Sequence, residues 1–386
     1  MQKTSVYHRL RAMYSAKMSH KVICGCSAIF AYLFVSLFFR MYPTTLASVE
    51  NFADGVNHND CACRHENVVY DFCYRLPTNL SIKGRRFDCK YIALLQNLKL
   101  LSNQSTVDFQ NHYMPAPRFV TAMSENHYKE GLTLIANIRK FWKTEWITVY
   151  DLGLDNKSAA NVQSKCFVDL RKFPFELYPD YVAKLKEYRW KPILIAMTLK
   201  EFGAVWYMDA SVRWFKDDRD VFYKEVTCSR SGLLERSNKT SSSKHCAKSS
   251  YLIVGPTIHS TYATTHFGLY NYLPTNTEEL KKNYCYAATF AFAVRTADTV
   301  ELMKWDVLCA LEKDCMAPPG AQLKCSFKKD KHRKYANCHR YDQSVINILL
   351  ANLYDHNPEG YVVKTSAIKF HRWAAKNISE DNFKCD

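Results

Sequence analysis

Short and long hydrophobic periods alternate along the second half of this chain. Three short apolar runs are typical of buried strands: 118–123, 146–150 and 204–208. Between them, 127–142 has apolar residues at helical spacing, and 181–202 is predicted to be mostly helical. Strands that alternate with helices in this order predict an α/β fold, in which a mostly parallel sheet carries helices on both faces.

Further elements are predicted on either side of this core. The residues 286–294 indicate another strand, 341–353 a helix, and 91–101 a shorter helix-like segment. The polar stretch 228–250 is predicted to be a surface loop that Cys228 and Cys246 close with their own disulfide.

The N-terminal part carries a different pattern. Residues 22–39 contain no charge, and at helical rise they span about 27 Å, close to the thickness of a thin bilayer. Five basic residues and no acids precede this run, so the positive-inside rule places 1–21 in the cytoplasm. We expect a single-pass type II signal-anchor in the Golgi or endoplasmic reticulum membrane. A cleaved signal peptide, cut near Ala47, is the alternative.

Cysteines and sequons agree with a lumenal location for the rest of the chain. Thirteen of the 15 cysteines follow the apolar run, a number typical of an oxidising compartment. Their odd number predicts an unpaired thiol or an intermolecular bridge, and hence a disulfide-linked dimer as one alternative. Five glycosylation sequons are spread over this part: Asn79, Asn103, Asn156, Asn238 and Asn377.

Composition divides the lumenal part in two. Residues 40–116 show little periodicity and are predicted to be a stem with a subdomain that disulfides hold together. A zinc site at Cys61 and Cys63 is disfavoured, because no second pair of ligands lies at metal-site spacing. Residues 117–386 form the predicted catalytic-type domain. The net charge of +16 includes six basic residues within the first forty, which read as topology signals, so no nucleic-acid partner is expected.

Candidate metal-binding residues follow the end of the strand 204–208. Asp209 follows it directly, and Ser211 is two residues further on, which places both side chains on one face. Oxygen ligands in this arrangement can hold a divalent cation, Mn²⁺ or Mg²⁺, against a diphosphate. Such a cation would assist the departure of a nucleoside diphosphate as a Lewis acid.

Several motifs together carry a resemblance: FVTAMSENHY at 119–128, YDLGL at 150–154, YRWKP at 188–192 and WYMDAS at 206–211. They resemble a nematode-rich family of uncharacterised type II membrane proteins. The core of that family is in turn similar to the GT-A fold of nucleotide-sugar transferases, particularly glycosyltransferase family eight. The resemblance covers about 117–214 well, and Asp342, Gln343 and Asn347 are similar to a later D-Q-x-x-x-N motif.

The resemblance implies roles for particular residues. Residues 120–126, with Thr121, Ser124 and Asn126, would line the nucleotide, Asp151 would lie near its base or ribose, and Lys191 near the donor phosphates.

It also implies a catalytic and metal-binding set. Asp209 and Ser211 would stand at the D-x-D positions, His371 at a late histidine ligand, and Asp342 near the acceptor or the donor sugar. Two departures lower the expected metal affinity. Ser211 replaces a carboxylate, and the late motif is reduced to His371-Arg-Trp.

Each of these residues also has a plainer interpretation. Asp209 could cap a turn, Lys191 could be a solvated residue ahead of a helix, Asp342 could be a charge at a helix N-terminus, and His371 could be structural. The basic cluster 324–340 could be a solvated face or a site for an anionic acceptor.

The pattern and the resemblance together predict a glycosyltransferase-like enzyme. It would transfer a sugar from a UDP-linked nucleotide-sugar donor to a glycan or glycoprotein acceptor. The alternative is a catalytically inactive lumenal protein that binds glycans or proteins and retains the transferase fold.

Overall fold

The computed structural model describes residues 61–109, 114–227, 248–372 and 380–385. All of them belong to one compact unit, His58–Asp386. No helix within these ranges is long and apolar enough to cross a membrane. The predicted anchor at 22–39 and the cytoplasmic tail lie outside the described residues.

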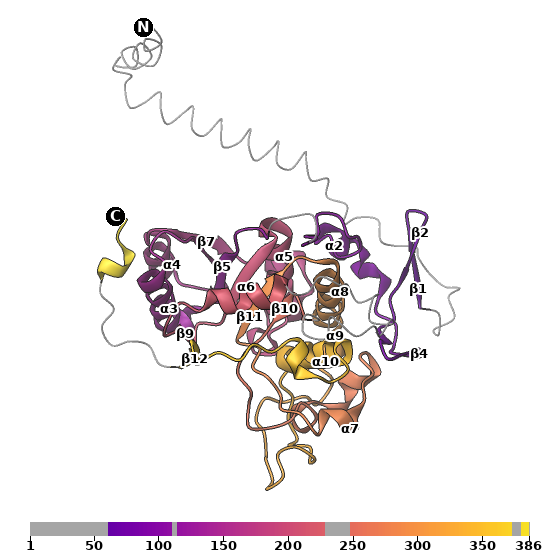
Figure 1. Ribbon diagram of the computed structural model, residues 1–386. Helices are drawn as coiled ribbons and strands as arrows, with labels where there is room; N and C mark the ends of the chain where they lie inside the picture. The colour runs from indigo at the N-terminus through magenta and orange to yellow at the C-terminus, as the bar shows by residue number, and fades with distance from the viewer. Residues whose placement is uncertain (1–60, 110–113, 228–247, 373–379, 386) are drawn as a thin grey trace. The chain divides into compact units, whose positions relative to one another are not determined.

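A six-stranded sheet in the order β10-β11-β8-β5-β6-β7 forms the centre of the molecule (Figure 1). Its strands are β5 (Arg118–Met123), β6 (Ile147–Asp151), β7 (Val168–Lys172), β8 (Ala204–Met208), β10 (Tyr251–Leu252) and β11 (Phe290–Val294). The four strands β7, β6, β5 and β8 are parallel, whereas β11 is antiparallel to β8, and β10 to β11. The predicted α/β fold with a mostly parallel sheet is confirmed.

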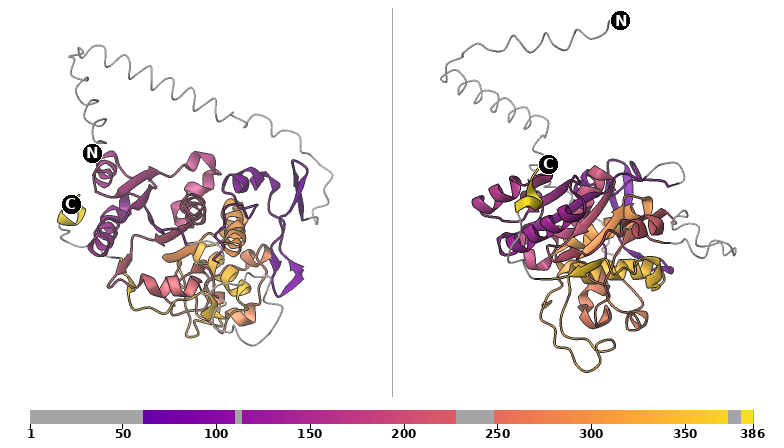
Figure 2. Two further views of the ribbon diagram at one scale, coloured as in Figure 1. Left: turned by 45° about the horizontal axis from the view of Figure 1, so that its top comes forward. Right: turned by 60° about the vertical axis from the view of Figure 1, so that its left-hand side comes forward.

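Alternation along β8 shows how the sheet separates two hydrophobic cores. Trp206 and Met208 point into one core, while Val205 and Tyr207 point into the other. The first core is covered by α3 (Tyr128–Phe141), α4 (Asn156–Gln163) and α6 (Arg219–Thr227). The second is covered by α5 (Trp190–Phe202), α8 (Ala297–Leu311) and α10 (Asp342–Leu353). Helices thus lie on both faces of the sheet (Figure 2).

The cysteine-rich segment near the N-terminus packs against α8. It comprises β1 (Ala62–His65), β2 (Val68–Asp71), β3 (Arg75–Leu76), β4 (Asn79–Lys83) and α2 (Ile92–Asn97). Disulfides Cys61–Cys73 and Cys63–Cys89 join its parts, which confirms the expected stapling. The rings of Tyr74 and Trp305 meet edge to face at 5.4 Å, so the segment shares a core with α8. The division of the chain at residue 117 stays a prediction.

Three further disulfides lie in the rest of the described chain: Cys166–Cys385, Cys309–Cys315 and Cys325–Cys338. Cys285 is a free, buried thiol, which fits the expectation of an unpaired cysteine. The predicted bridge between Cys228 and Cys246 lies outside the described residues. Ser249 and Ser250, at the end of that predicted surface loop, are buried where the chain enters β10.

Three predicted elements are shorter in the structure. The predicted helix 181–202 begins only at Trp190, because the chain before it forms short 3-10 turns and Tyr188 has a left-handed backbone with φ of 55°. The segment 91–101 is α-helical only to Asn97. The strand expected from 286 begins at Phe290. The remaining short elements are α7 (Thr277–Leu280), α9 (Lys313–Met316), β9 (Val212–Trp214) and β12 (Ile368–Phe370).

Candidate active site

The order of the strands defines where a ligand would bind. The chain adds β6 and β7 on one side of β5 and then returns to place β8 on its other side. The connections therefore diverge between β5 and β8, and ligands of such sheets bind beyond the carboxyl ends of the strands at this point. Ser124 follows β5 there, and Asp209 follows β8.

Three charged side chains from three elements meet beside this edge. The Nζ atom of Lys191, in the first turn of α5, lies 2.6 Å from Asp342 Oδ2 and 3.2 Å from Asp209 Oδ1. Asp342 is the first residue of α10. Lys191 also donates a hydrogen bond of 3.2 Å to the carbonyl oxygen of Ala288, just before β11. One ammonium thus joins α5, α10 and the end of β8.

Asp209 is held from a second direction as well. The hydroxyl of Tyr207 donates to Asp209 Oδ1 at 2.6 Å, an arrangement that follows from the two-residue repeat of a strand. The side chain of Asp209 is 22% exposed, compared with 6% for Lys191 and 10% for Asp342. Asp209 is therefore the member of the cluster with the most surface available to a ligand.

Burial and charge act against each other on Lys191. Burial alone lowers the pKa of its ammonium, but the charges of Asp209 and Asp342 raise it by more, so that the pKa is raised overall. Lys191 stays protonated at neutral pH. It is buried, which excludes the interpretation as a solvated residue ahead of a helix.

A third acid, Asp306, interacts with this cluster. Asp306, in the middle of α8, is 4% exposed, and its Oδ1 atom has no hydrogen-bond partner among the described residues. Burial raises its pKa well above 3.8, and the charge of Asp342 adds to this while Lys191 opposes it. Burial also raises the pKa of Asp342, and Lys191 offsets part of that effect. Three carboxyl groups, those of Asp209, Asp342 and Asp306, therefore interact with one ammonium.

Of the residues expected to line a nucleotide, Ser124, Asn126 and Asp151 lie at the ends of β5 and β6. Ser124 donates to Asn126 Oδ1 at 2.6 Å, which orders the turn after β5. Asp151, the last residue of β6, accepts hydrogen bonds from the backbone of Gly153 and Leu154, at 2.7 and 2.6 Å. Thr121 lies inside β5 with no exposed surface, and its hydroxyl has no hydrogen-bond partner within the described ranges.

Ser211 and His371 are brought together by backbone pairing. β12 pairs with β9, and the backbone N–H of His371 donates to the carbonyl oxygen of Ser211 at 2.7 Å. In the part of the chain that the structure describes, however, neither Asp209 nor His371 belongs to a group of three acidic, histidine or cysteine ligands within metal-binding reach. Because Asp209 is also paired with Lys191, these residues do not fit a well-formed cation site.

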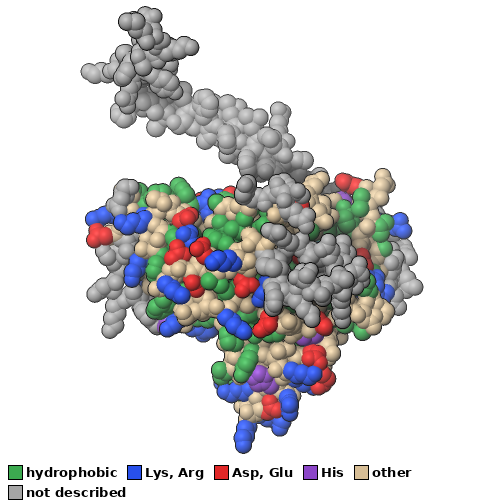
Figure 3. Space-filling view, viewed as in Figure 1, with side chains coloured by type: hydrophobic (Ala, Val, Ile, Leu, Met, Phe, Trp, Pro, Cys, Tyr) green, Lys and Arg blue, Asp and Glu red, His purple; other side chains and the backbone are tan. Residues whose placement is uncertain are grey.

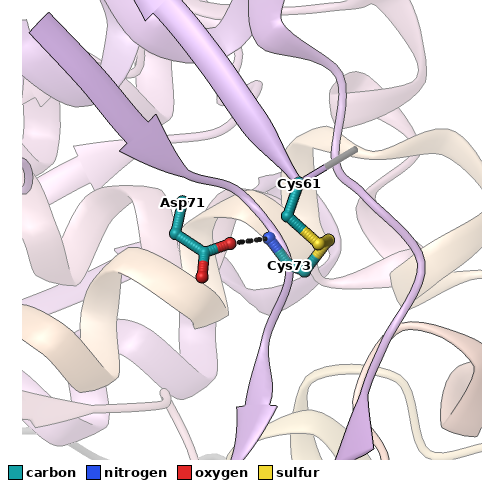
Figure 4. Close-up of side chains that lie close together, drawn as sticks. All are labelled: Cys61, Asp71 and Cys73. Carbon is teal, nitrogen blue, oxygen red and sulfur yellow. Dashed lines mark hydrogen bonds between the residues drawn. A yellow bond between two sulfur atoms is a disulfide. The ribbon is translucent and has the colours of Figure 1, made fainter. Parts of the chain in front are cut away.

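The group that does meet the distance requirement for a metal is Cys61, Asp71 and Cys73 (Figure 4). Both cysteines are joined in a disulfide, and Asp71 Oδ1 accepts a hydrogen bond of 3.0 Å from the backbone of Cys73. A thiolate is needed to bind a metal, so this group is a structural staple and not a metal centre.

A cavity of about 1000 Å³ lies elsewhere, between the cysteine-rich segment, α8 and α10. Its walls include Tyr74, Glu301, Lys304, Trp305, Asn352 and Glu359. None of the Lys191 cluster lines it. Position at the sheet edge is the stronger guide to a site in this class of fold, so we assign the candidate site to Asp209 and not to this cavity.

Sequence reasoning missed two members of the site. Tyr207 could have been found, since it lies two residues before Asp209 on a strand and so shares its face. Asp306 could also have been found, since it lies between Trp305 and Val307 in an apolar stretch of α8. Acids are seldom fully buried, so an acid at a position predicted to be buried indicates a special role. The Ala288 carbonyl carries no signal in the sequence.

One protein-family model matches part of this chain. A family described as "Protein of unknown function (DUF1647)" matches residues 60–196, which include Lys191 but neither Asp209 nor Asp342. No curated protein matches the sequence significantly.

Solved structures with a similar fold include glycosyltransferases. The galactosyltransferase LgtC, in complex with donor and acceptor sugar analogs, is 11% identical with a TM-score of 0.33, over 67% of this chain and 88% of LgtC. The bifunctional glycosyltransferase WbbM is 14% identical with a TM-score of 0.31, over 61% of this chain and 38% of WbbM. Likeness at this level does not carry function to this chain, so the function has to be argued from the site.

Proposed function

We propose that this chain is a glycosyltransferase-like enzyme that moves a sugar from a nucleotide-sugar donor, UDP-linked, to a hydroxyl of a glycan or glycoprotein. The observation that supports it is the meeting of Lys191, Asp209 and Asp342 at the point where the strand order reverses. Nucleotides bind at this place in open α/β sheets, and the cluster puts charge and hydrogen-bond acceptors beside it.

The proposed work of the cluster is binding and orientation. Asp209 is held by Tyr207 and Lys191, so its carboxylate faces the crevice in a fixed orientation and accepts hydrogen bonds from hydroxyls of the donor. Asp342 is more deeply buried and balances the charge of Lys191. Ser124 and Asn126 follow β5, the strand next to β8, and would contact the donor from there.

A divalent cation has no step in this proposal. Mn²⁺ or Mg²⁺ would neutralise the leaving diphosphate if it were bound, but the carboxylate that would hold it is already paired with Lys191. Buried disulfides agree with a lumenal location, and we propose the Golgi or endoplasmic reticulum membrane with a type II orientation.

A second candidate function rests on the same observation. If the pairing of Asp209 with Lys191 persists on ligand binding, the fold would serve a lumenal protein that binds glycans or proteins without turnover. Ser211 in place of a carboxylate favours this alternative.

Calorimetry of the purified full chain with a panel of nucleotide sugars separates the two. We expect micromolar to millimolar binding of one UDP-sugar and its slow hydrolysis without acceptor. Binding without any hydrolysis or transfer would favour the second function. If no nucleotide sugar binds with or without Mn²⁺, both the donor and the assignment of the crevice are wrong.

A further inference from the structure

A basic loop precedes α10 and projects from the body of the molecule. This basic loop, residues 324–334, has six basic side chains against a single acid: Lys324, Lys328, Lys329, Lys331, Arg333 and Lys334. The ribbon shows the segment extending away from the sheet on the side of α7 and α10 (Figures 1 and 2). In the space-filling view, Lys and Arg side chains gather on this projection (Figure 3).

The basic loop is tied down at its base and along its length. Cys325 and Cys338 close it with a disulfide, and the backbone of Ser326 bonds to that of Ala336 at 2.7 Å. Nearer the tip, the hydroxyl of Ser260 donates to the carbonyl oxygen of His332 at 2.7 Å. A loop held in this way presents its charges with little further loss of entropy on binding.

The cations of the basic loop are not neutralised from within the protein. Asp330, the one acid, directs Oδ1 to the backbone N–H groups of His332 and Arg333, at 2.9 and 2.8 Å. No ion pair joins the six basic side chains to any residue that the structure describes. Their charges are therefore available to an external anion, with Lys324, Lys328, Lys329, Arg333 and Lys334 exposed.

Aromatic rings are interleaved with these cations. Phe327 of the loop is 37% exposed and stacks on His259 at 5.3 Å. Phe267, 48% exposed, packs against Tyr335 at 4.7 Å, and Tyr284, 51% exposed, lies against His332 at 5.0 Å. Each exposed ring packs against another ring, and the Lys331 ammonium lies 5.9 Å from the centre of the Phe327 ring.

We infer that the basic loop binds an acidic glycan, a sugar chain that carries carboxylates or sulfates, and that this is the class of acceptor. The role of this glycan as the acceptor rests on the proposed function, whereas its binding to the loop does not. Lysine and arginine pair with the anionic groups, and the aromatic faces take the apolar faces of the sugar rings.

Other polyanions fit this surface less well. A membrane surface would call for apolar side chains free to insert, whereas the rings here are packed against other rings. Nucleic acid is disfavoured, since the disulfides indicate an oxidising compartment. The chain runs from the basic loop through Arg340 to Asp342 at the start of α10, so the loop is joined directly to one element of the candidate site.

The test uses the full chain and two double variants. Lys328→Ala/Lys329→Ala removes two cations of the loop. Lys157→Ala/Lys172→Ala removes two exposed lysines from α4 and β7, where no ion pair with a described residue is lost. Heparin and chondroitin sulfate serve as acidic glycans, dextran as a neutral glycan, and phosphatidylserine vesicles and duplex DNA as other polyanions.

We expect the wild type to bind heparin and chondroitin sulfate but not dextran. The loop variant should bind them roughly tenfold more weakly and with a shallower dependence on salt, as counterion release requires. The control variant should bind as the wild type does. Equal weakening in both variants, or no binding of acidic glycans at all, would overturn the inference. Binding of vesicles or DNA as tight as that of chondroitin sulfate would overturn it too.

Stabilisation by UDP-sugars, measured on the same variants, keeps the two proposals apart. We expect it to be unchanged in the loop variant, because the partners of Lys191, Asp209 and Asp342 in the described residues include neither Lys328 nor Lys329. Loss of UDP-sugar binding in every form of the protein, with glycan binding intact, would remove the transferase proposal and leave the glycan surface.

Discussion

Lys191 and Asp342 form a buried ion pair, with 2.6 Å between Nζ and Oδ2, although they lie on helices far apart in the sequence. The same ammonium reaches Asp209 at the end of β8. This pair ties the helix that packs under the sheet to the helix that follows the basic loop. A ligand that binds Asp209 would therefore contact a carboxylate whose ammonium partner also binds α10.

The first prediction concerns Lys191→Met. This change leaves the buried Asp342 and the partly exposed Asp209 without their shared cation, and removal of one partner of a buried pair typically costs about 3–5 kcal/mol. We expect a large fall in Tm in thermal melts. The double variant Lys191→Met/Asp342→Asn should recover part of the loss, because one of the two stranded charges is gone. Additive losses in the two changes would show that the pair is not coupled.

The second prediction concerns Asp306→Asn. Burial, with a contribution from Asp342, holds the pKa of Asp306 well above 3.8 in the folded chain. The folded state therefore keeps a proton that the unfolded state releases, so stability falls as pH rises from about 3.8 towards the raised pKa. The asparagine variant lacks this loss.

Thermal melts at several pH values test the sign. The variant should match the wild type near pH 4 and be more stable at pH 7, by up to about 1.4 kcal/mol for each pH unit within the window. A variant that is less stable than the wild type by the same amount at both pH values would indicate that Asp306 has a hydrogen-bond role instead.

The third prediction concerns Asp209→Asn, which removes a charge at nearly constant volume. If Asp209 orients the donor, the rate should fall about a hundredfold or more, while folding survives because Tyr207 can still bond the amide oxygen. Asp220→Asn, an exposed acid in the first turn of α6, is the control. Stabilisation by UDP-sugar that persists undiminished in the Asp209 variant would contradict the assignment.

The fourth prediction concerns topology. The three sequons within the described ranges, at Asn79, Asn103 and Asn156, are all exposed and so open to glycosylation. In intact microsomes, protease should spare the chain after Arg40, and glycosidase treatment should then lower its mass. Complete digestion without detergent would show that the orientation is the reverse.

The sequence by itself determined four of the six strands of the sheet and the place of its edge, but neither β7 nor β10. The strands 118–123 and 204–208 were predicted at their observed bounds, because a short apolar run with alternating faces is a local property of the chain. The position of Asp209 at a strand end follows from the same pattern. The oxidised state of the cysteines was also readable, although their pairing was not.

The tertiary structure alone decided how the site is assembled. The contact of Lys191 with Asp342 and the burial of Asp306 depend on how α5, α8 and α10 pack on the sheet, and no local pattern encodes distances between segments so far apart. The same holds for the start of α5: helical periodicity predicts residue 181, but the left-handed backbone of Tyr188 delays the start to Trp190. Periodicity reports which face of an element is buried, whereas the partner across that face is selected by packing of the whole chain.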